Sequence, residues 1–275
     1  MICYIPWDVS PEVFRIGHFV LRWYSGLIVI AFLTCYFLAA RMIEREGDPK
    51  RIQENGTFYF LTGLIMGARL GHCFFYDPSF YLHQPLEIGM VWKGGLSSHG
   101  AIVGMMFGMW IYARKVRIPW FWFIDKLAVV FTLAGVFIRT GNLLNSEAIG
   151  VQTTVPWGFI FLRRGEDFPR HPAQLYEAFA YLAIFLWLYL LHAKKWKELK
   201  GGYITGLALI TVFLLRFIIE FVKDSPPFFD HFISLNTGQV LSLPLILLGI
   251  YLVWANWGSL GNRSIKGCKG QVLEL

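Results

Sequence analysis

The sequence predicts an all-α polytopic membrane protein. Of its 275 residues, 56% are hydrophobic and only 16% are charged, and the aromatic share of 17% includes 11 tryptophans. The mean hydropathy is +0.50, a value that soluble globular domains rarely reach. The apolar residues also gather in long segments with basic residues between them, which favours several transmembrane helices in one chain.

Seven segments are apolar enough to cross a membrane as helices, because about 20 residues cover the roughly 30 Å of hydrocarbon. They lie at approximately 19–40, 57–76, 96–113, 120–139, 173–192, 203–222 and 238–257. The fourth and sixth carry an arginine near one end, which lowers their hydropathy, but their neighbours still favour a span. No basic region precedes the first, and we expect a retained span rather than a signal peptide.

The distribution of Lys and Arg predicts the orientation, since basic residues accumulate on the cytoplasmic side. Fourteen of them lie in the first, third and fifth connections and in the C-terminal tail: Arg41, Arg45, Lys50, Arg51, Arg114, Lys115, Arg117, Lys194, Lys195, Lys197, Lys200, Arg263, Lys266 and Lys269. Six lie on the other side: Arg15, Lys93, Arg163, Arg164, Arg170 and Lys223. This bias predicts that the N-terminus is outside and the C-terminus is cytoplasmic.

The longest connection on the predicted outer side runs from about 140 to 172, between spans four and five. Residues 153–161 within it are rich in β-branched and aromatic side chains, which favours a small extended element. We expect this periplasmic connection to form a cap over an active site.

The most informative stretch is residues 139–150, which follow the apolar run 127–138. It places a guanidinium, two carboxamides and a carboxylate at helix-like spacing beside two glycines: Arg139, Asn142, Asn145, Glu147, Gly141 and Gly150. Such groups are unfavourable within a membrane and usually mark a functional site. The alternative is that Arg139 only reaches a lipid headgroup and the rest is a polar loop.

The second and third spans carry two further candidates. Glycines recur there every four residues, which predicts close packing of the two helices: Gly63, Gly67, Gly71, Gly100, Gly104 and Gly108. Arg69 has no acidic residue within one helical turn to neutralise it. His99 opens the third span, and its neutral imidazole can accept a proton near pH 7, unless it is only a capped or interfacial residue.

Arg216 and Glu220 are four residues apart in the sixth span and share one helical face. An internal ion pair is one interpretation, but Arg before Glu is the less favourable order, so each is also expected to prefer a partner on another helix or a ligand. Polar residues also stand at the mouths of two spans, at 171–177 and at Tyr24. They are typical of the membrane interface, although Tyr24 can turn its hydroxyl inward.

These residues indicate a membrane protein that handles an anionic, phosphate-bearing, lipid-soluble ligand near its outer face, because forked arginine donors suit phosphate. The basic residues form no arm or repeat, so we expect no nucleic-acid partner. The cysteines are too scattered for a disulfide framework or a zinc site: Cys3, Cys35, Cys73 and Cys268. The sequence has no P-loop, metal-ligand motif or nucleophile elbow, and we expect neither a cofactor nor a metal.

The block at 139–150 also matches a known signature in register at six positions: Arg139, Gly141, Asn142, Asn145, Glu147 and Gly150. With it, the chain resembles the bacterial prolipoprotein diacylglyceryl transferases. The resemblance continues in family order at Tyr24, at residues 67–71, at His99 and Gly100, at residues 171–177 and at residues 216–221. Ile138, Leu143 and Ala101 depart from the family pattern, but none of these departures removes a polar functional group.

The resemblance implies a seven-span enzyme of the bacterial inner membrane with its active site toward the periplasm. Such an enzyme transfers the diacylglyceryl group of phosphatidylglycerol to the lipobox cysteine of prolipoprotein signal peptides, forms a thioether and releases glycerol phosphate. Its catalytic candidates are His99, as base or as a group that orients the thiol, and Arg139 and Arg216, as stabilisers of the leaving phosphate. The expected phosphatidylglycerol-binding residues are Arg139, Asn142, Asn145, Glu147, Gly150, Tyr24, Arg69 and Glu220.

Two finer expectations follow from the same resemblance: Asn142, Asn145 and Glu147 are expected to position the headgroup or hold Arg139, and Glu220 is expected to set the position of Arg216. We expect residues 1–275 to form one catalytic domain within the membrane. A secondary transporter or lipid flippase is the main alternative, but it predicts two related halves, and no internal repeat is visible. A purely structural scaffold leaves Arg69, Arg139 and Arg216 unexplained.

Overall fold

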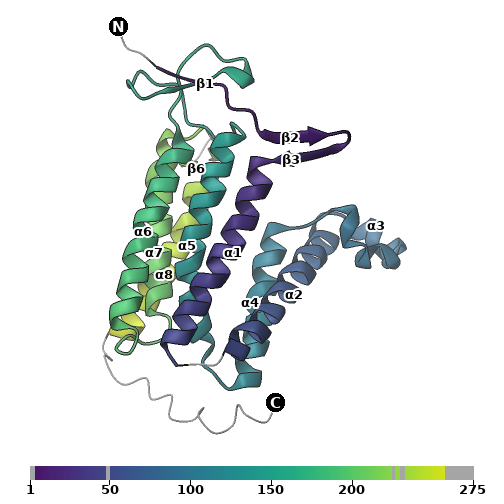
Figure 1. Ribbon diagram of the computed structural model, residues 1–275, viewed down its shortest axis with the longest axis vertical. Coiled ribbons are helices and arrows are strands. Elements are labelled where there is room, and N and C mark those ends of the chain that lie inside the picture. The colour runs from purple at the N-terminus through teal and green to yellow at the C-terminus, as the bar shows by residue number, and fades with distance from the viewer. Residues whose placement is uncertain (1–3, 48–49, 225–226, 230–232, 258–275) are drawn as a thin grey trace. The chain divides into compact units, whose positions relative to one another are not determined.

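The computed structural model describes residues 4–47, 50–224, 227–229 and 233–257, and the chain divides into two compact units (Figure 1). Of the described residues, one unit holds those up to Ala39 and those from Ile124 to Trp257, and the other holds Ala40–Phe123. The boundaries lie within two helices, α1 (Trp23–Arg45) and α5 (Trp120–Leu144).

The first unit is built around long helices. Besides most of α1 and α5 it contains α6 (Ala173–Lys195), α7 (Tyr203–Ile219) and α8 (Thr237–Trp257), with α7 packed against both α6 and α8. Asp125 on α5 is 1% exposed, and its carboxylate accepts hydrogen bonds from the main-chain N–H groups of Gly202 and Thr205. These N–H groups lie at the start of α7, where no intrahelical acceptor exists, so a buried carboxylate both caps α7 and ties it to α5.

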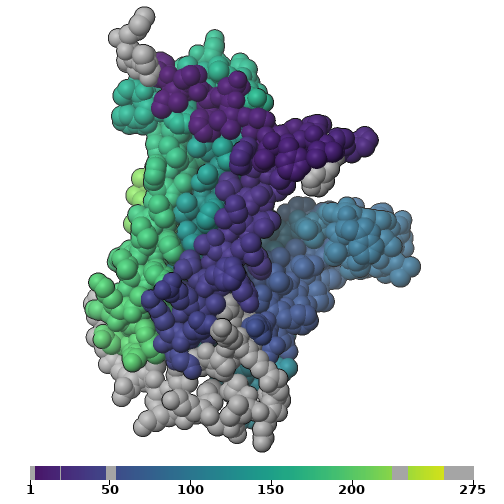
Figure 2. All heavy atoms as spheres, viewed as in Figure 1, coloured from purple at the N-terminus to yellow at the C-terminus, as the bar shows by residue number. Residues whose placement is uncertain are grey.

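Short strands gather at the end of this unit where α5 stops and α6 starts. β1 (Ile5–Trp7) pairs in parallel with β4 (Phe159–Phe161), with Pro6 opposite Ile160. Figure 2 shows the N-terminal atoms in contact with those of the connection between α5 and α6 at this end. A small apolar core lies beneath the strands and contains Leu143, Ile149, Phe159, Phe161, Trp7 and Leu175.

Two antiparallel strand pairs complete the first unit. β2 (Glu12–Ile16) and β3 (Phe19–Arg22) form a hairpin that leads directly into α1, and Gly17 supplies the positive φ of its turn. β5 (Pro227–Phe229) pairs with β6 (Ile233–Asn236), which leads into α8. Short 3-10 turns, η3 (Leu162–Arg164) and η4 (Glu220–Val222), follow β4 and α7.

The second unit is a helical hairpin with a short helical connection. Its long helices are α2 (Lys50–Phe75) and α4 (Ser98–Val116), joined by α3 (Pro78–His83), η1 (Pro85–Gly89) and η2 (Val91–Lys93). A Cβ atom added at Gly67 would lie 2.6 Å from the Cα atom of Gly104, and one added at Gly71 would lie 2.7 Å from that of Gly100. The two backbones therefore touch, which confirms the packing role predicted for these glycines.

Six helices in the described part of the chain are long and apolar enough to cross a membrane: α1, α2 from Glu54, α5, α6, α7 with η4, and α8. The third predicted span corresponds to α4, which is not among the six because His99 and the basic residues Arg114 and Lys115 lower its hydropathy. The seventh span and the orientation remain predictions. The fold is mostly rather than wholly helical, since short strands occur at the end of the first unit.

Some sequence-based expectations remain predictions, and others concern residues outside this description. Extended structure was expected at 153–161, and β4 forms at its end, but a cap function remains a prediction. The basic tail residues Arg263, Lys266 and Lys269 lie outside the described residues, as do Cys3 and Cys268. The side chains of Lys50 and Arg51 are also not described. Cys35 and Cys73 are unpaired.

Candidate active site at the end of α5

The block at 139–150 forms the end of α5, up to Leu144, and a tight loop. Asn145 N–H donates to Gly141 O at 3.0 Å, and Glu147 N–H donates to Asn142 O at 2.9 Å, so the chain folds back on the helix end. Ser146 and Ala148 make this turn with φ angles of 52° and 53°. Left-handed backbone is uncommon for residues other than glycine and is typical of sites where surrounding contacts hold the chain in place.

Arg139 lies on α5 before its last turn, which ends at Leu144, and it forms an ion pair with a residue of α6. Its Nε atom is 3.0 Å from Glu177 Oε2, and the two side chains are 14% and 0% exposed. Arg139 also donates a hydrogen bond to Asn142 Oδ1 at 3.4 Å. Glu147, the partner considered from the sequence, makes no ion pair with Arg139 in the described structure.

The Glu177 carboxylate extends the ion pair toward the end of α7. Lys223 Nζ lies 3.7 Å from Glu177 Oε1 and 3.7 Å from Glu220 Oε2. Four alternating charges thus run from α5 through α6 to η4. Gly238 at the start of α8 leaves room for the Glu220 carboxylate, because a Cβ atom there would lie 2.6 Å from Glu220 Cδ.

Arg216 on α7 is the third cation of this region. It is half-buried, and its side chain makes neither a hydrogen bond nor an ion pair among the described residues. The Tyr181 hydroxyl lies within electrostatic range of Arg139, Arg216 and Glu177. We refer to Arg139, Glu177, Lys223, Glu220 and Arg216 together as the charged cluster. Glu220 pairs with Lys223 and makes no ion pair with Arg216 among the described residues. The expectation that Glu220 sets the position of Arg216 therefore remains a prediction.

Glu147 is exposed beside the charged cluster and interacts with amides. Its carboxylate accepts from Asn142 Nδ2 at 3.5 Å and from Asn145 Nδ2 at 3.4 Å. Its main-chain carbonyl accepts from Gln174 Nε2 of α6 at 2.5 Å. The two carboxamides and the carboxylate predicted from the block are therefore brought together in one polar group.

Tyr24 and the two glycines of the block have packing roles in the structure. The ring of Tyr24, from α1, covers Gly141, where an added Cβ atom would lie 2.6 Å from Tyr24 Cδ2. Gly150 is buried, and a Cβ atom there would lie 2.5 Å from His171 Cβ and 2.6 Å from Val222 O. Gly150 therefore allows three segments to meet, and its expected contact with lipid remains a prediction.

A second polar group lies at the start of α6. Trp157 Nε1 donates to the Tyr176 hydroxyl at 2.8 Å, and this hydroxyl lies 3.1 Å from His171 Nδ1. Partial burial lowers the pKa of His171 below its ordinary value of 6.5. His171 is therefore neutral at pH 7, and its Nδ1 can accept the Tyr176 hydrogen.

Arg69 belongs to the second unit and binds main-chain carbonyls. It is 3% exposed, its Nε donates to Ile88 O at 3.0 Å, and its Nη1 donates to the carbonyls of Gly94 and Gly95. Its Nη2 donates to Glu87 O. All three guanidinium nitrogens thus hold the connection that precedes α4. The predicted contact with phosphatidylglycerol requires one of these nitrogens to bind both a main-chain carbonyl and the lipid.

His99 lies at the start of α4, directly after this connection. Ser97 accepts the Gly100 N–H at 3.2 Å and thereby caps the helix. The exposed His99 side chain lines an apolar groove of about 790 Å³ on the α2–α4 pair, together with Leu70, Phe74 and Phe107. A base at the edge of an apolar groove is accessible to a group carried on a lipid or an apolar peptide.

Sequence reasoning missed four polar residues of the first unit: Gln174, Glu177, Tyr181 and Lys223. Gln174 and Glu177 stood in a recognised motif, but they were interpreted as an interfacial collar. Lys223 was counted only as a loop charge, although its position three residues after Glu220 could have suggested a pair. Within the described ranges no group of His, Cys, Asp and Glu is arranged to hold a metal ion.

Comparison with known proteins shows the family of this chain. The model of the family described as prolipoprotein diacylglyceryl transferase matches residues 11–255, most of the chain. The chain belongs to this family. With six helices suited to crossing a membrane, it is a multi-pass membrane protein and a transferase of lipoprotein biosynthesis.

Curated relatives extend over nearly the whole length of the chain. A phosphatidylglycerol–prolipoprotein diacylglyceryl transferase of Chloroherpeton thalassium is 40% identical over 253 residues, which cover 91% of this chain and 94% of the relative. Proteins of the same name from Tolumonas auensis and Bacteroides fragilis are 38% and 37% identical, over 90% and 91% of this chain and 95% and 94% of their own lengths. Their names give phosphatidylglycerol as the donor and prolipoprotein as the acceptor.

Proposed function

We propose that this protein transfers the diacylglyceryl group of phosphatidylglycerol to the lipobox cysteine of prolipoproteins, and that its charged cluster stabilises the leaving phosphate. The family and the names of the relatives support the donor and the acceptor. The charge balance of the cluster is the observation that carries the residue assignment.

Three cations of the cluster face two carboxylates. Arg139 and Lys223 interact with Glu177, and Lys223 also interacts with Glu220, whereas Arg216 has no ion-pair partner among the described residues. One net positive charge in a partly buried site suits the single negative charge of a phosphodiester. Fixed guanidinium donors there would stabilise the charge that grows on the leaving oxygen.

The proposed step is a displacement at carbon. The cysteine sulfur attacks the glyceryl carbon that carries the phosphate ester, a carbon–sulfur bond forms, and the carbon–oxygen bond breaks. The electron pair leaves with glycerol phosphate. A thiol with a pKa of about 8.5 must first lose its proton, and we assign His99 as the acceptor of that proton.

The remaining assignments concern the lipid headgroup and its surroundings. Asn142, Asn145 and Glu147 offer amide donors and an exposed carboxylate to the glycerol headgroup. Tyr24, Gly150, Arg69 and Glu220 complete the proposed phosphatidylglycerol-binding set. We further propose that residues 1–275 act as one catalytic domain of the inner membrane, with seven spans, an external N-terminus, a cytoplasmic C-terminus and a periplasmic cap at 140–172.

The deciding experiment incubates the purified protein with phosphatidylglycerol and a lipobox peptide and measures the mass of the peptide. We expect the peptide to gain one diacylglyceryl group on cysteine while glycerol phosphate is released. An unmodified peptide under conditions where a relative is active would refute the proposed function and redirect attention to lipid transport.

Two variants test the roles. Arg139→Lys keeps the charge but loses the forked donors, and we expect turnover to fall by about 10²–10³-fold. His99→Gln should abolish transfer. Near-normal turnover in the first variant would contradict bidentate phosphate binding, and substantial activity in the second would contradict His99 as the obligatory base.

A further inference from the structure

The loop at 145–150 is held from outside by side chains that have no place in the proposed chemistry. Ser146 and Ala148 adopt left-handed backbone, which is unfavourable for both residue types unless other contacts fix it. The contacts that fix this loop therefore decide where Glu147 lies.

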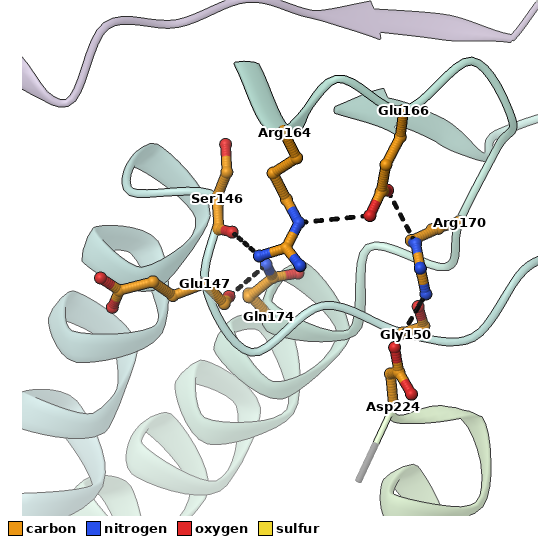
Figure 3. Close-up of polar contacts among 8 residues, drawn as sticks. All are labelled: Ser146, Glu147, Gly150, Arg164, Glu166, Arg170, Gln174 and Asp224. Carbon is orange, nitrogen blue, oxygen red and sulfur yellow. Dashed lines mark hydrogen bonds and ion pairs between the residues drawn. The ribbon is translucent and has the colours of Figure 1, made fainter. Parts of the chain in front are cut away.

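Two arginines bind carbonyl groups at the two ends of the loop. Arg164 Nη1 donates to Ser146 O at 3.4 Å, and Arg170 Nη1 donates to Gly150 O at 3.2 Å. Gln174 binds the carbonyl between them, that of Glu147. In Figure 3 the Glu147 carbonyl faces Gln174, whereas its carboxylate extends away from these contacts.

Glu166 joins the two arginines. Its Oε1 accepts from Arg164 Nε at 3.3 Å and its Oε2 accepts from Arg170 Nε at 2.7 Å, as Figure 3 shows. Arg170 also lies 3.0 Å from Asp224 Oδ2. The side chains of Glu166 and Arg170 are only 12% and 15% exposed, so this contact is better shielded from water than an ordinary surface pair.

We propose that Glu166 is a positioning residue for phosphatidylglycerol binding. It orients Arg164 and Arg170, the arginines hold the carbonyls of Ser146 and Gly150, and the fixed loop presents the Glu147 carboxylate to the carboxamides of the block. Glu166 itself touches no reacting group. The inference rests on the proposed function to the extent that Asn142, Asn145 and Glu147 bind the lipid headgroup.

The neighbouring Arg163 provides a matched control. It carries the same charge on the same short turn, but it pairs with Asp8, with Arg163 Nε 3.0 Å from Asp8 Oδ1. Both side chains of this pair are largely exposed, and neither contacts the loop at 145–150. Arg163→Gln therefore removes a charge from the same surface without removing a loop contact.

The test compares Glu166→Gln and Arg170→Lys with Arg163→Gln in the full-length protein. We expect the first two to raise the KM for phosphatidylglycerol about tenfold while the KM for the lipobox peptide stays within about twofold. Arg163→Gln should change neither value. A purely structural role would instead lower the amount of active enzyme and leave both KM values unchanged.

A second measurement does not depend on activity. Hydrogen exchange across residues 145–151 should accelerate in Glu166→Gln and Arg170→Lys but not in Arg163→Gln, because the Glu147 and Gly150 N–H groups are hydrogen-bonded in the intact loop. Unchanged exchange, or faster exchange with an unchanged KM for phosphatidylglycerol, would overturn the inference. A wild-type protein that transfers no diacylglyceryl group refutes the proposed function instead, and the exchange data still decide whether Glu166 holds the loop.

Discussion

Arg139 and Arg69 are both arginines within apolar helices, and the structure satisfies them in different ways. Arg139 pairs with a fully buried carboxylate, Glu177, which also interacts with Lys223. Arg69 has no acidic partner among the described residues and donates from all three nitrogens to main-chain carbonyls. One charge is balanced by another charge, and the other is balanced by dipoles.

The difference indicates two roles for arginine in these helices, one structural and one in substrate binding. A guanidinium that is saturated by carbonyl groups fixes the path of a chain, here the connection that leads to Ser97 and His99. A guanidinium held through Nε by a single carboxylate keeps other donors available for an anionic substrate. Charge within a membrane segment therefore does not by itself identify a catalytic residue, and its partners separate the two cases.

The largest expected effect comes from removing the charge partner of Arg139. Glu177→Gln keeps the size of the side chain but leaves Arg139 and Lys223 without this carboxylate. Breaking a buried pair at one partner is strongly destabilising, and the freed arginine also changes position. We expect kcat/KM for transfer to fall by at least about 100-fold in the peptide-mass assay.

Glu12→Gln is the control for this variant. Glu12 pairs with Arg15 at 2.5 Å on the exposed hairpin, where the hydrogen bond from Arg15 lowers the pKa of the carboxyl. Its loss should leave transfer unchanged. Activity within a few-fold of wild type in Glu177→Gln would remove the basis for distinguishing Arg139 from Arg69.

The second prediction concerns Arg69, the arginine that is bound by carbonyl groups. Arg69→Lys keeps a positive charge but cannot reach the carbonyls of Ile88, Gly94 and Gly95 together, so buried acceptors lose their donors. We expect the free energy of unfolding to fall by about 1–3 kcal/mol. Thermal unfolding in detergent measures this loss, and Arg139→Lys should instead lose activity with a smaller change in the unfolding temperature.

Unchanged stability together with weaker lipid binding would contradict this interpretation of Arg69. If Arg69→Lys unfolds like the wild type but shows a raised KM for phosphatidylglycerol, Arg69 acts mainly as a lipid ligand, as in the binding set proposed above, and not as a support for the connection before α4. The same measurement therefore decides between the two roles of Arg69.

An effect of similar size concerns the helix pair that carries Arg69 and His99. A Cβ atom at Gly104 would lie 2.6 Å from Gly67 Cα, so Gly104→Ala must push α2 and α4 apart. We expect a loss of about 1–3 kcal/mol in the free energy of unfolding, as for other overpacked sites. Gly26→Ala in α1 is the matched control, because beyond the local backbone of α1 no atom of the described residues lies within 4 Å of the added Cβ. Equal unfolding temperatures for the two variants would show that the α2–α4 contact is not tight.

The smallest effect is a pH dependence at the start of α6. The Nδ1 atom of neutral His171 lies 3.1 Å from the Tyr176 hydroxyl and can accept its hydrogen, and burial lowers the pKa of His171 below 6.5. The contribution of this contact is therefore present above pH 6.5 and is lost as the pH falls through the lowered value. The unfolding temperatures of wild type and Tyr176→Phe should differ slightly at pH 8 and converge at low pH.

Tyr251→Phe, on an exposed face of α8, should show no such dependence. A difference that grows on acidification would contradict the assignment.

The sequence by itself determined the long helices and the residue types of the site. Span length is set by bilayer thickness, and the apolar runs therefore located the long helices of the described residues, although α2 begins at Lys50, before the predicted 57, and α5 continues past the predicted 139 to Leu144. The glycine spacing likewise determined how α2 and α4 pack, since four-residue periodicity places small residues on one helical face. The block at 139–150 could also be identified from the sequence, because its polar groups interrupt an apolar pattern.

Only the tertiary structure decided which partners these groups have. Glu177 and Lys223 meet Arg139 and Glu220 from separate segments of the chain, and Arg69 is satisfied by carbonyl groups that no side-chain pattern reveals. Such contacts depend on how each helix is rotated and shifted against its neighbours. Local periodicity gives the buried face of a helix but not that rotation or shift, and so the pairing of charges follows from packing rather than from sequence spacing.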